Sequence, residues 1–304
     1  MKVRIVCSAT VQKFNLKIHQ AFIYEQVESL RKTDPNLEFE YFLIEKGGIS
    51  GYIKSWLKLR KQSKCDLMHA HGGLPALLSV LVFREPVIST FHGSDVNVKK
   101  IRIFSAFAAL LSKKSIYVSK YLQKKSLIRS RSSVIPCGVD LDLFKPMDRD
   151  ECCRKLGLPP ENRYILFASA FNNAVKNYSL LKKALEHWPD EALTVLELKG
   201  ISREMVPIYM NAANICVLTS FSEGSPQFVK EALACNRPLV STAVGDVTEL
   251  IDGSINCRIT KFDPVDLHKH IVDLITEEKS DGRKNMVNYN VYTIASQIIN
   301  LYKS

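Results

Sequence analysis

The sequence predicts an α/β protein built from two doubly wound parallel-sheet domains in tandem. Short apolar runs typical of strands alternate with segments whose apolar residues recur at helical spacing, and this alternation runs along the whole chain. The chain has 304 residues, 46% of them hydrophobic, which is enough for two separate cores. Strands joined by single helices pair in parallel and carry helices on both faces of the sheet.

The first half supplies the first sheet. The expected strands are Val3–Ala9, Phe39–Ile44, Leu67–His71, Val87–His92, Ile116–Ser119 and Val134–Pro136. The expected helices between them are Ile18–Lys32, Tyr52–Lys64, Leu74–Val82, Ile101–Ser112 and Lys120–Arg129.

The second half repeats the scheme. The expected strands are Ile165–Ser169, Leu193–Leu196, Ile215–Thr219 and Pro238–Thr242, and the expected helices are Ser179–Glu186, Arg203–Ala213, Pro226–Cys235 and Pro264–Thr276. A polar connector ending at Pro146 separates the halves, so we expect domains at 1–145 and 146–304, with the final helix free to return to the first domain. Ligands of open α/β sheets bind beyond the carboxyl ends of the strands, so two such domains predict a cleft.

Composition excludes several other classes of protein. The chain has no low-complexity tract, no apolar segment near 18 residues and no leader with a small-residue cleavage site at its start. Its eight cysteines form no CxxC pair and lie mostly in apolar runs, which predicts buried, reduced thiols. We therefore expect a cytoplasmic location.

Charge is distributed unevenly between the halves. Met1 to Lys145 carries 24 Lys and Arg against 11 Asp and Glu, a net +13, whereas the remainder carries 18 against 20, a net −2. A basic first half predicts an anionic partner, and charge alone does not choose between a membrane surface, an acidic polymer and a nucleic acid.

The densest chemical signal is the segment from Thr219 to Cys235. A strand ends at Thr219, and Ser225-Pro226 predicts a helix start with Ser225 as N-cap and Pro226 at the first helical position. The amide groups of Gly224, Ser225 and Gln227 would then face a ligand, as they do where helix starts hold phosphates or hydroxyls.

Two carboxylates flank this helix start. Glu223 precedes it and Glu231 lies about one and a half turns into the helix, and carboxylates suit vicinal diols because they accept two hydrogen bonds. The alternative from spacing alone is that Glu223 lies on a loop and Glu231 faces solvent.

The motif EGSPQFVKEALAC, followed by PLVSTAVGDVTELI, resembles the donor-site signature of family-four glycosyltransferases with the GT-B fold. Further matches lie in the expected order: DLMHAHG from Asp66, TFHGSD from Thr90, VSKYLQKK from Val118, VIPCGVDLDLFKP from Val134 and VKN from Val175. Together these segments span most of the chain.

This resemblance implies a retaining, metal-independent transfer of a hexose-type sugar from a UDP-, GDP- or ADP-linked donor to a glycan or lipid-linked acceptor, without a cofactor. It implies that Glu231 binds the nucleotide ribose, Glu223 the transferred sugar and Lys176 the diphosphate, while His92 touches the sugar from the first domain. It further implies a donor site and an acceptor side. The donor site also includes Gly224, Ser225, Pro226, Gln227, Asn172, Asn173, Gly245, Asp246 and Glu249, and the acceptor side consists of Thr10, His71, Gly72, Ser94 and Asp95.

The chain departs from the family at two places. The family has a glycine pair after the first strand, where this chain has Ser8 to Gln12, and an arginine before the lysine, where this chain has Asn172 and Asn173. The segment between Leu196 and Arg203 is also short. Two alternatives therefore stay open: a non-catalytic relative that binds sugar nucleotides, and a basic protein that binds membrane or nucleic acid.

Two other kinds of site are weaker interpretations. His69 and His71 fall on one face of a strand and, with His92, predict a metal site if their strands adjoin, although no carboxylate or cysteine completes the set. No GxGxxG follows the first strand, which excludes the usual dinucleotide-binding loop.

The basic half contains an amphipathic segment, Tyr52 to Lys64, with five cations, no acid and an apolar stripe. A second cluster joins Lys99, Lys100 and Arg102 to Lys113 and Lys114 across an apolar helix. This pattern predicts docking on an anionic membrane surface at the inner face, where a lipid-linked acceptor would lie. The alternative is that both stripes pack on the sheet, and nucleic-acid binding is disfavoured because no aromatic residues interleave the cations.

Overall fold

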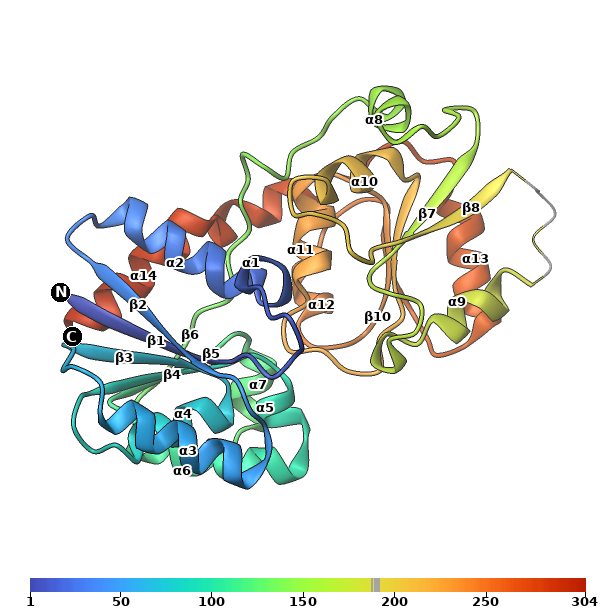
Figure 1. Ribbon diagram of the computed structural model, residues 1–304. Helices are drawn as coiled ribbons and strands as arrows, with labels where there is room; N and C mark the ends of the chain where they lie inside the picture. Colours follow the sequence, from blue (N-terminus) through green and yellow to red (C-terminus); the bar gives the residue numbers. More distant parts are fainter. Residues whose placement is uncertain (187, 189–191) are drawn as a thin grey trace. The chain divides into compact units, whose positions relative to one another are not determined.

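The computed structural model describes residues 1–186, 188 and 192–304, which form two units, each around its own parallel sheet (Figure 1). Unit 1 comprises Met1–Gly138 and Val291–Ser304, and unit 2 comprises Val139–Asn290. The chain therefore changes unit after Gly138 and not at the expected 145. The reason is packing, because Val139 and Phe144 are fully buried in the core of unit 2.

Unit 1 contains a parallel sheet with the strand order β2-β1-β3-β4-β5-β6. Its strands are β1 (Lys2–Ser8), β2 (Glu38–Ile44), β3 (Leu67–His71), β4 (Val87–Phe91), β5 (Lys114–Tyr117) and β6 (Ser132–Val134). Strands β3 and β4 are buried along their whole length, as expected for the centre of a sheet covered on both faces.

Helices cover both faces of this sheet. They are α1 (Leu16–His19), α2 (Ala21–Thr33), α3 (Gly48–Arg60), α4 (Gly73–Val80), α5 (Ser94–Asn97), α6 (Lys99–Leu111), α7 (Lys120–Lys125) and α14 (Val291–Lys303). Figure 1 shows α2 and α14 on one face and α3, α4 and α6 on the other, and two separate apolar clusters lie under these two layers. The final helix α14 packs on α2 within unit 1.

Unit 2 has the strand order β11-β10-β9-β7-β8, again parallel. Its strands are β7 (Arg163–Phe167), β8 (Leu193–Glu197), β9 (Ile215–Leu218), β10 (Leu239–Thr242) and β11 (Cys257–Thr260). Its helices are α8 (Arg149–Leu156), η1 (Ala174–Lys176), α9 (Tyr178–Ala184), α10 (Val206–Ala212), α11 (Gln227–Ala234), α12 (Val247–Leu250), α13 (Pro264–Leu274) and η2 (Gly282–Tyr289). Residues of α9 and α13 share one apolar cluster, and those of α8, α10, α11 and α12 share the other.

The structure corrects several expected elements. The helix expected over Ile18–Lys32 is divided into α1 and α2 at Gln20, whose φ of −141° is not helical and whose side-chain amide donates to the carbonyl of Ser8 at 2.7 Å. The helix expected over Tyr52–Lys64 begins four residues earlier, at Gly48, and ends at Arg60.

Several elements were not anticipated, among them helix α8 and strand β11. Helix α8 is rich in charge and has little apolar periodicity, and it is fixed instead by its ends: the Asp148 carboxylate accepts the Glu151 amide at 2.8 Å, and Gly157 closes it with φ +68°. Strand β11 is a short edge strand with Arg258 exposed, so it lacks a continuous apolar run.

No helix in the described part of the chain is both long and apolar enough to cross a bilayer.

Candidate functional site

The strand orders place one topological switch point in each unit. In unit 1, β2 pairs on one side of β1 and β3 on the other, so the switch point lies between β1 and β3. In unit 2, β8 pairs on one side of β7 and β9 on the other, so the switch point lies between β7 and β9. Loops diverge at these points and leave a crevice beyond the carboxyl ends of the two strands. The predicted site residues should therefore follow β7 and β9 in unit 2, and β1, β3 and β4 in unit 1.

Lys176 and Glu223 meet at the switch point of unit 2. Lys176 ends η1 after β7, Glu223 lies in the loop after β9, and the Lys176 Nζ to Glu223 Oε1 distance is 2.7 Å. Both side chains are partly exposed, at 22% and 15%. A cation and a carboxylate from two different βα loops are thus held within reach of one small ligand.

Thr219, just after the end of β9, links the loop that carries Lys176 to the loop that carries Glu223 through hydrogen bonds. Its buried hydroxyl lies 2.8 Å from the carbonyl oxygen of Lys176 and 2.9 Å from that of Asn177, and the amide of Phe221 donates to the carbonyl of Val175 at 2.9 Å. Asn177 itself adopts a left-handed conformation, with φ +53°, which ends η1 and starts α9. These contacts fix the backbone that carries Lys176 relative to the loop that carries Glu223.

Glu231 lies on the fully buried part of α11 and is only 4% exposed. Its Oε1 is 2.7 Å from Nη2 of Arg203, a residue of the segment between β8 and α10. The guanidinium carbon of Arg203 lies over the Phe144 ring at 4.5 Å from the centroid. A buried carboxylate needs such a partner, because an unpaired charge away from water is costly. The alternative that Glu231 faces solvent is therefore wrong.

The loop after β10 lies directly against the loop that contains Glu223. Gly245 has φ +59°, and a Cβ at this position would lie 2.8 Å from the carbonyl oxygen of Gly224. Only glycine satisfies both the left-handed backbone and this close approach. The next residue, Asp246, is half-buried with its Oδ1 shielded from solvent, and this burial raises the pKa of its carboxyl to about 6, while neighbouring Lys230 opposes the rise.

In unit 1, Asp95 joins the turns that follow β3 and β4. Its Oδ1 accepts the amide of Gly73 at 2.8 Å and its Oδ2 accepts the amide of His92 at 2.8 Å. His92 Nε2 lies 3.1 Å from Nδ1 of His71, and its ring packs against Phe22 with centroids 4.7 Å apart. The His92 ring is therefore fixed just after the end of β4, and Gly72, with φ +99°, is the N-cap of α4.

His69 has a different role from the one that a metal site would require. Its Nδ1 lies 2.6 Å from the hydroxyl of Tyr302 and its Nε2 lies 2.7 Å from that of Thr90, so both ring nitrogens are already engaged. Within the described residues, no group of three or more His, Cys, Asp and Glu side chains is arranged to hold a metal ion. The metal interpretation of His69, His71 and His92 is therefore not supported by their geometry.

Two family models match the chain over adjacent, non-overlapping segments. Residues 31–143 match the model described as Glycosyltransferase Family 4, and residues 180–277 match the model described as Glycosyl transferases group 1. The chain belongs to the family-four-like glycosyltransferases. The putative teichuronic acid biosynthesis glycosyltransferase TuaC of Bacillus subtilis is 33% identical over 224 residues, which cover 64% of this chain. The chain spans 58% of the length of that relative.

Solved structures show that the fold of this family-four-like glycosyltransferase is GT-B. Sucrose-phosphate synthase from Thermosynechococcus elongatus matches with a TM-score of 0.82 at 15% identity, covering 100% of this chain and 98% of that one. Anabaena HepE in complex with UDP and glucose matches with a TM-score of 0.76 at 16% identity, covering 100% of this chain and 99% of that one.

The structure brings together most of the donor-side residues that the sequence predicted for this glycosyltransferase. Helix α11, however, begins at Gln227 with Pro226 as its N-cap and without a side-chain cap, so the prediction that Ser225 is the N-cap is wrong by one residue. The Ser225 hydroxyl is instead turned inward beside Asp246.

Other predicted residues occupy more peripheral positions. The side chain of Asn173 makes a hydrogen bond within its own turn, because its Oδ1 accepts the amide of Val175 at 3.2 Å. Asn172, Glu249, Thr10 and Ser94 are exposed. The structure leaves the roles of these five residues as predictions.

Sequence reasoning missed three contacts in the sites of this glycosyltransferase. Arg203 was assigned only to a helix, yet it pairs with Glu231; Cys137 Sγ lies 3.7 Å from His92 Nδ1; and Tyr302 of α14 holds His69. Two cations, Lys199 and Arg203, lie in the segment between β8 and α10, and no local pattern shows which of them would meet Glu231. The other two contacts join residues 45 and 233 positions apart, and no local pattern reports such pairs.

Proposed function

We propose that the chain transfers a hexose from a nucleoside-diphosphate sugar to a hydroxyl of a glycan or lipid-linked acceptor, with retention of configuration and without a metal ion. The observation that carries this proposal is the convergence of Lys176 and Glu223 at the switch point of unit 2, with the buried Glu231 on the helix that follows. A sugar nucleotide has three parts that such a site could hold: a ribose, a diphosphate and a sugar.

Each residue has a role that follows from its chemistry. When the bond between sugar C1 and the diphosphate oxygen breaks, the bonding electrons leave with the nucleoside diphosphate, and the Lys176 ammonium stabilises the charge that develops there. Glu223 then accepts hydrogen bonds from the sugar hydroxyls, and Glu231 from the ribose diol. The acceptor oxygen forms the new bond to C1 and passes its proton to the departing phosphate.

Known relatives support the choice of donor and pathway class. HepE has been solved with UDP and with UDP-glucose, and the name of TuaC places that relative in teichuronic acid biosynthesis. We therefore favour a uridine-linked donor and a role in cell-surface polysaccharide assembly. Because all eight cysteines are free, we propose a reducing, cytoplasmic site of action.

A nucleotide screen tests the donor site directly. Thermal shift is measured with UDP, GDP, ADP and their sugars on the wild-type chain, on Glu231→Gln and on the exposed control Glu278→Ala. We expect one nucleotide to raise the melting temperature of the wild type and of the control. Titration of the shift with that nucleotide should give Glu231→Gln a dissociation constant at least tenfold higher. Equal binding by all three proteins would place the donor site elsewhere.

A turnover assay separates an enzyme from a binding relative. Release of the nucleoside diphosphate from the selected sugar nucleotide is followed with and without an acceptor glycan. Nucleotide binding without release of the diphosphate would identify the chain as a non-catalytic relative, whereas neither binding nor release would leave only a basic binding protein.

A further inference from the structure

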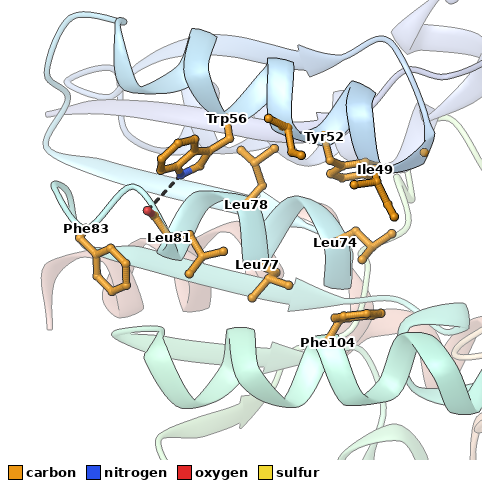
Figure 2. Close-up of a pocket in the computed structure, with 11 residues that line it drawn as sticks. Ile49, Tyr52, Trp56, Leu74, Leu77, Leu78, Leu81, Phe83 and Phe104 are labelled. Carbon is orange, nitrogen blue, oxygen red and sulfur yellow. Dashed lines mark hydrogen bonds between the residues drawn. The ribbon is translucent and has the colours of Figure 1, made fainter.

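Unit 1 has a groove of about 590 Å³ between α3, α4 and α6, remote in sequence from the residues of the donor site. Figure 2 shows Ile49, Tyr52 and Trp56 of α3 and a row of leucines of α4 turned into this space, with Phe104 of α6 facing it. Its volume is in the range of small-molecule sites in proteins.

The groove is lined almost entirely by hydrocarbon. None of its lining side chains is charged, and the two polar atoms of its aromatic rings have partners: Trp56 Nε1 donates to the Leu81 carbonyl at 3.0 Å, and the Tyr52 hydroxyl lies 3.2 Å from Ser8 Oγ. A sugar or nucleotide would lose its hydrogen bonds with water there and gain none in return. An aliphatic chain fits this lining.

Apolar side chains also continue outward from the groove onto the surface. Ile49 is 83% exposed, and along one side of α6 five large apolar side chains are 46% to 55% exposed: Ile103, Phe104, Phe107, Leu110 and Leu111. A contiguous exposed surface of this kind indicates a contact with a partner or a membrane. The interpretation that these stripes pack on the sheet is therefore wrong for much of their length.

Phe83 at the end of the groove adds a separate observation. It is 75% exposed and adopts a left-handed backbone with φ +54°, a conformation that favours glycine or asparagine. A phenylalanine there strains the backbone and leaves its ring in water, so the fold gains nothing from it. Such a residue suggests a function outside the fold.

The charges around these helices decide the kind of partner. Residues 46–65 and 96–139, which contain α3 and α6, carry 16 Lys and Arg and no Asp or Glu. Unit 1 as a whole has 24 cations against 9 carboxylates, a net +15. Two copies of this face would repel each other, whereas an anionic surface would attract it.

We propose that this face of unit 1 docks on an anionic lipid bilayer, with Ile49, Phe83 and Phe104 entering the acyl region and a lipid hydrocarbon chain filling the groove. Long basic side chains can extend to the headgroups while their stems cover apolar surface. Apolar insertion and headgroup attraction then act together, as in interfacial helices.

The test is flotation of the full chain with vesicles of phosphatidylcholine alone or mixed with phosphatidylglycerol. We expect binding only to the anionic vesicles, and weaker binding at high salt. Phe83→Asn and Phe104→Ser should each reduce the partition coefficient roughly tenfold or more, since each removes an inserted aromatic ring. Replacing Lys54 or Lys58 with glutamine should reduce it about fivefold.

Two features of this design keep the result interpretable. Asparagine favours the left-handed backbone of Phe83, so Phe83→Asn should not unfold unit 1, and thermal unfolding verifies this. Val265→Ser removes an equally exposed apolar residue, at 75%, from unit 2 and should leave vesicle binding unchanged.

Equal binding of wild type, Phe83→Asn and Phe104→Ser would overturn the proposal, and so would equal binding to neutral vesicles. A lipid-free dimer in light scattering that Phe83→Asn dissociates would overturn it in favour of self-association. Flotation needs no sugar nucleotide, so loss of nucleotide binding with intact flotation refutes the donor site alone, and the reverse result refutes the docking face alone.

Discussion

Lys176 and Glu223 lie 2.7 Å apart although 46 residues separate them in the chain. In the absence of a donor each neutralises the other, and an incoming diphosphate would compete with the Glu223 carboxylate for the Lys176 ammonium. The pair therefore links diphosphate binding to release of the carboxylate that we assign to the sugar.

This competition predicts opposite effects of two single substitutions on nucleotide binding. Glu223→Gln removes the competing charge and should leave UDP affinity unchanged or increase it up to about tenfold, whereas Lys176→Gln should decrease it by about tenfold or more. Isothermal titration calorimetry at low salt measures both. Both variants should transfer the sugar to the acceptor more slowly than the wild type. Weaker UDP binding in Glu223→Gln would contradict the competition.

The Arg203–Glu231 pair predicts that substitutions of its two residues have non-additive effects on the free energy of unfolding. Arg203→Gln leaves a buried carboxylate without its cation and should lower the free energy of unfolding by about 3 kcal/mol. Adding Glu231→Gln should restore part of that loss, because the unpaired charge is then removed. Urea unfolding of the two single variants and the double variant gives the coupling energy, and additive losses would show that the pair contributes nothing.

Gly245 allows a matched comparison. Gly245→Ala and Gly253→Ala both place a Cβ at a left-handed backbone, with φ +59° and +65°, but only the first meets a neighbour, the Gly224 carbonyl oxygen at 2.8 Å. Each should lose about 1 kcal/mol from backbone strain. Only Gly245→Ala should also displace the loop that carries Glu223 and weaken nucleotide binding. Equal effects of both substitutions on binding would argue against this contact.

Asp246 predicts a dependence of unit 2 stability on pH. Its pKa is about 6 in the folded chain because burial disfavours the ionised form, against 3.8 as the ordinary value. The unfolded chain therefore loses its proton first, and this group's contribution to the free energy of unfolding falls by about 3 kcal/mol as the pH rises from about 4 to 6. Asp246→Asn should remove this dependence and stabilise the chain at pH 7.5, whereas the exposed control Asp252→Asn should do neither. Urea unfolding at several pH values provides the measurement.

His69 predicts the opposite pH dependence for unit 1. Burial lowers the pKa of His69 to about 3, and that of His71 is also held well below its ordinary value of 6.5. Below pH 6.5 the unfolded chain binds a proton at His69 that the folded chain does not, so His69 alone lowers the free energy of unfolding by about 2 kcal/mol between pH 6.5 and 5, and His71 acts in the same direction. Imidazole nitrogen shifts in NMR should show the His69 ring neutral at pH 5. A charged His69 at that pH would contradict the buried contacts with Tyr302 and Thr90.

Much of the donor site could be predicted from sequence because its residues follow strands. Strand ends are visible in local apolar patterns, and this placed Glu223 and Gly224 in a loop after a strand. Lys176 and Gly245 were expected in the same region only because of the resemblance to family-four glycosyltransferases. The N-cap of α11 was misplaced because Ser225 has two possible uses, and only the position of Asp246 in space shows which one applies.

The sequence by itself determined the alternation of strands and helices, the two sheets, the basic character of the first half and the helix start after Glu223, since these depend on neighbours within a few residues. Only the tertiary structure decided that Arg203 meets Glu231, that Tyr302 holds His69, that the chain changes unit after Gly138 and that α3, α4 and α6 leave an apolar groove. Periodicity reports which side of a helix is apolar, whereas the order of strands in the sheet decides whether another element covers that side.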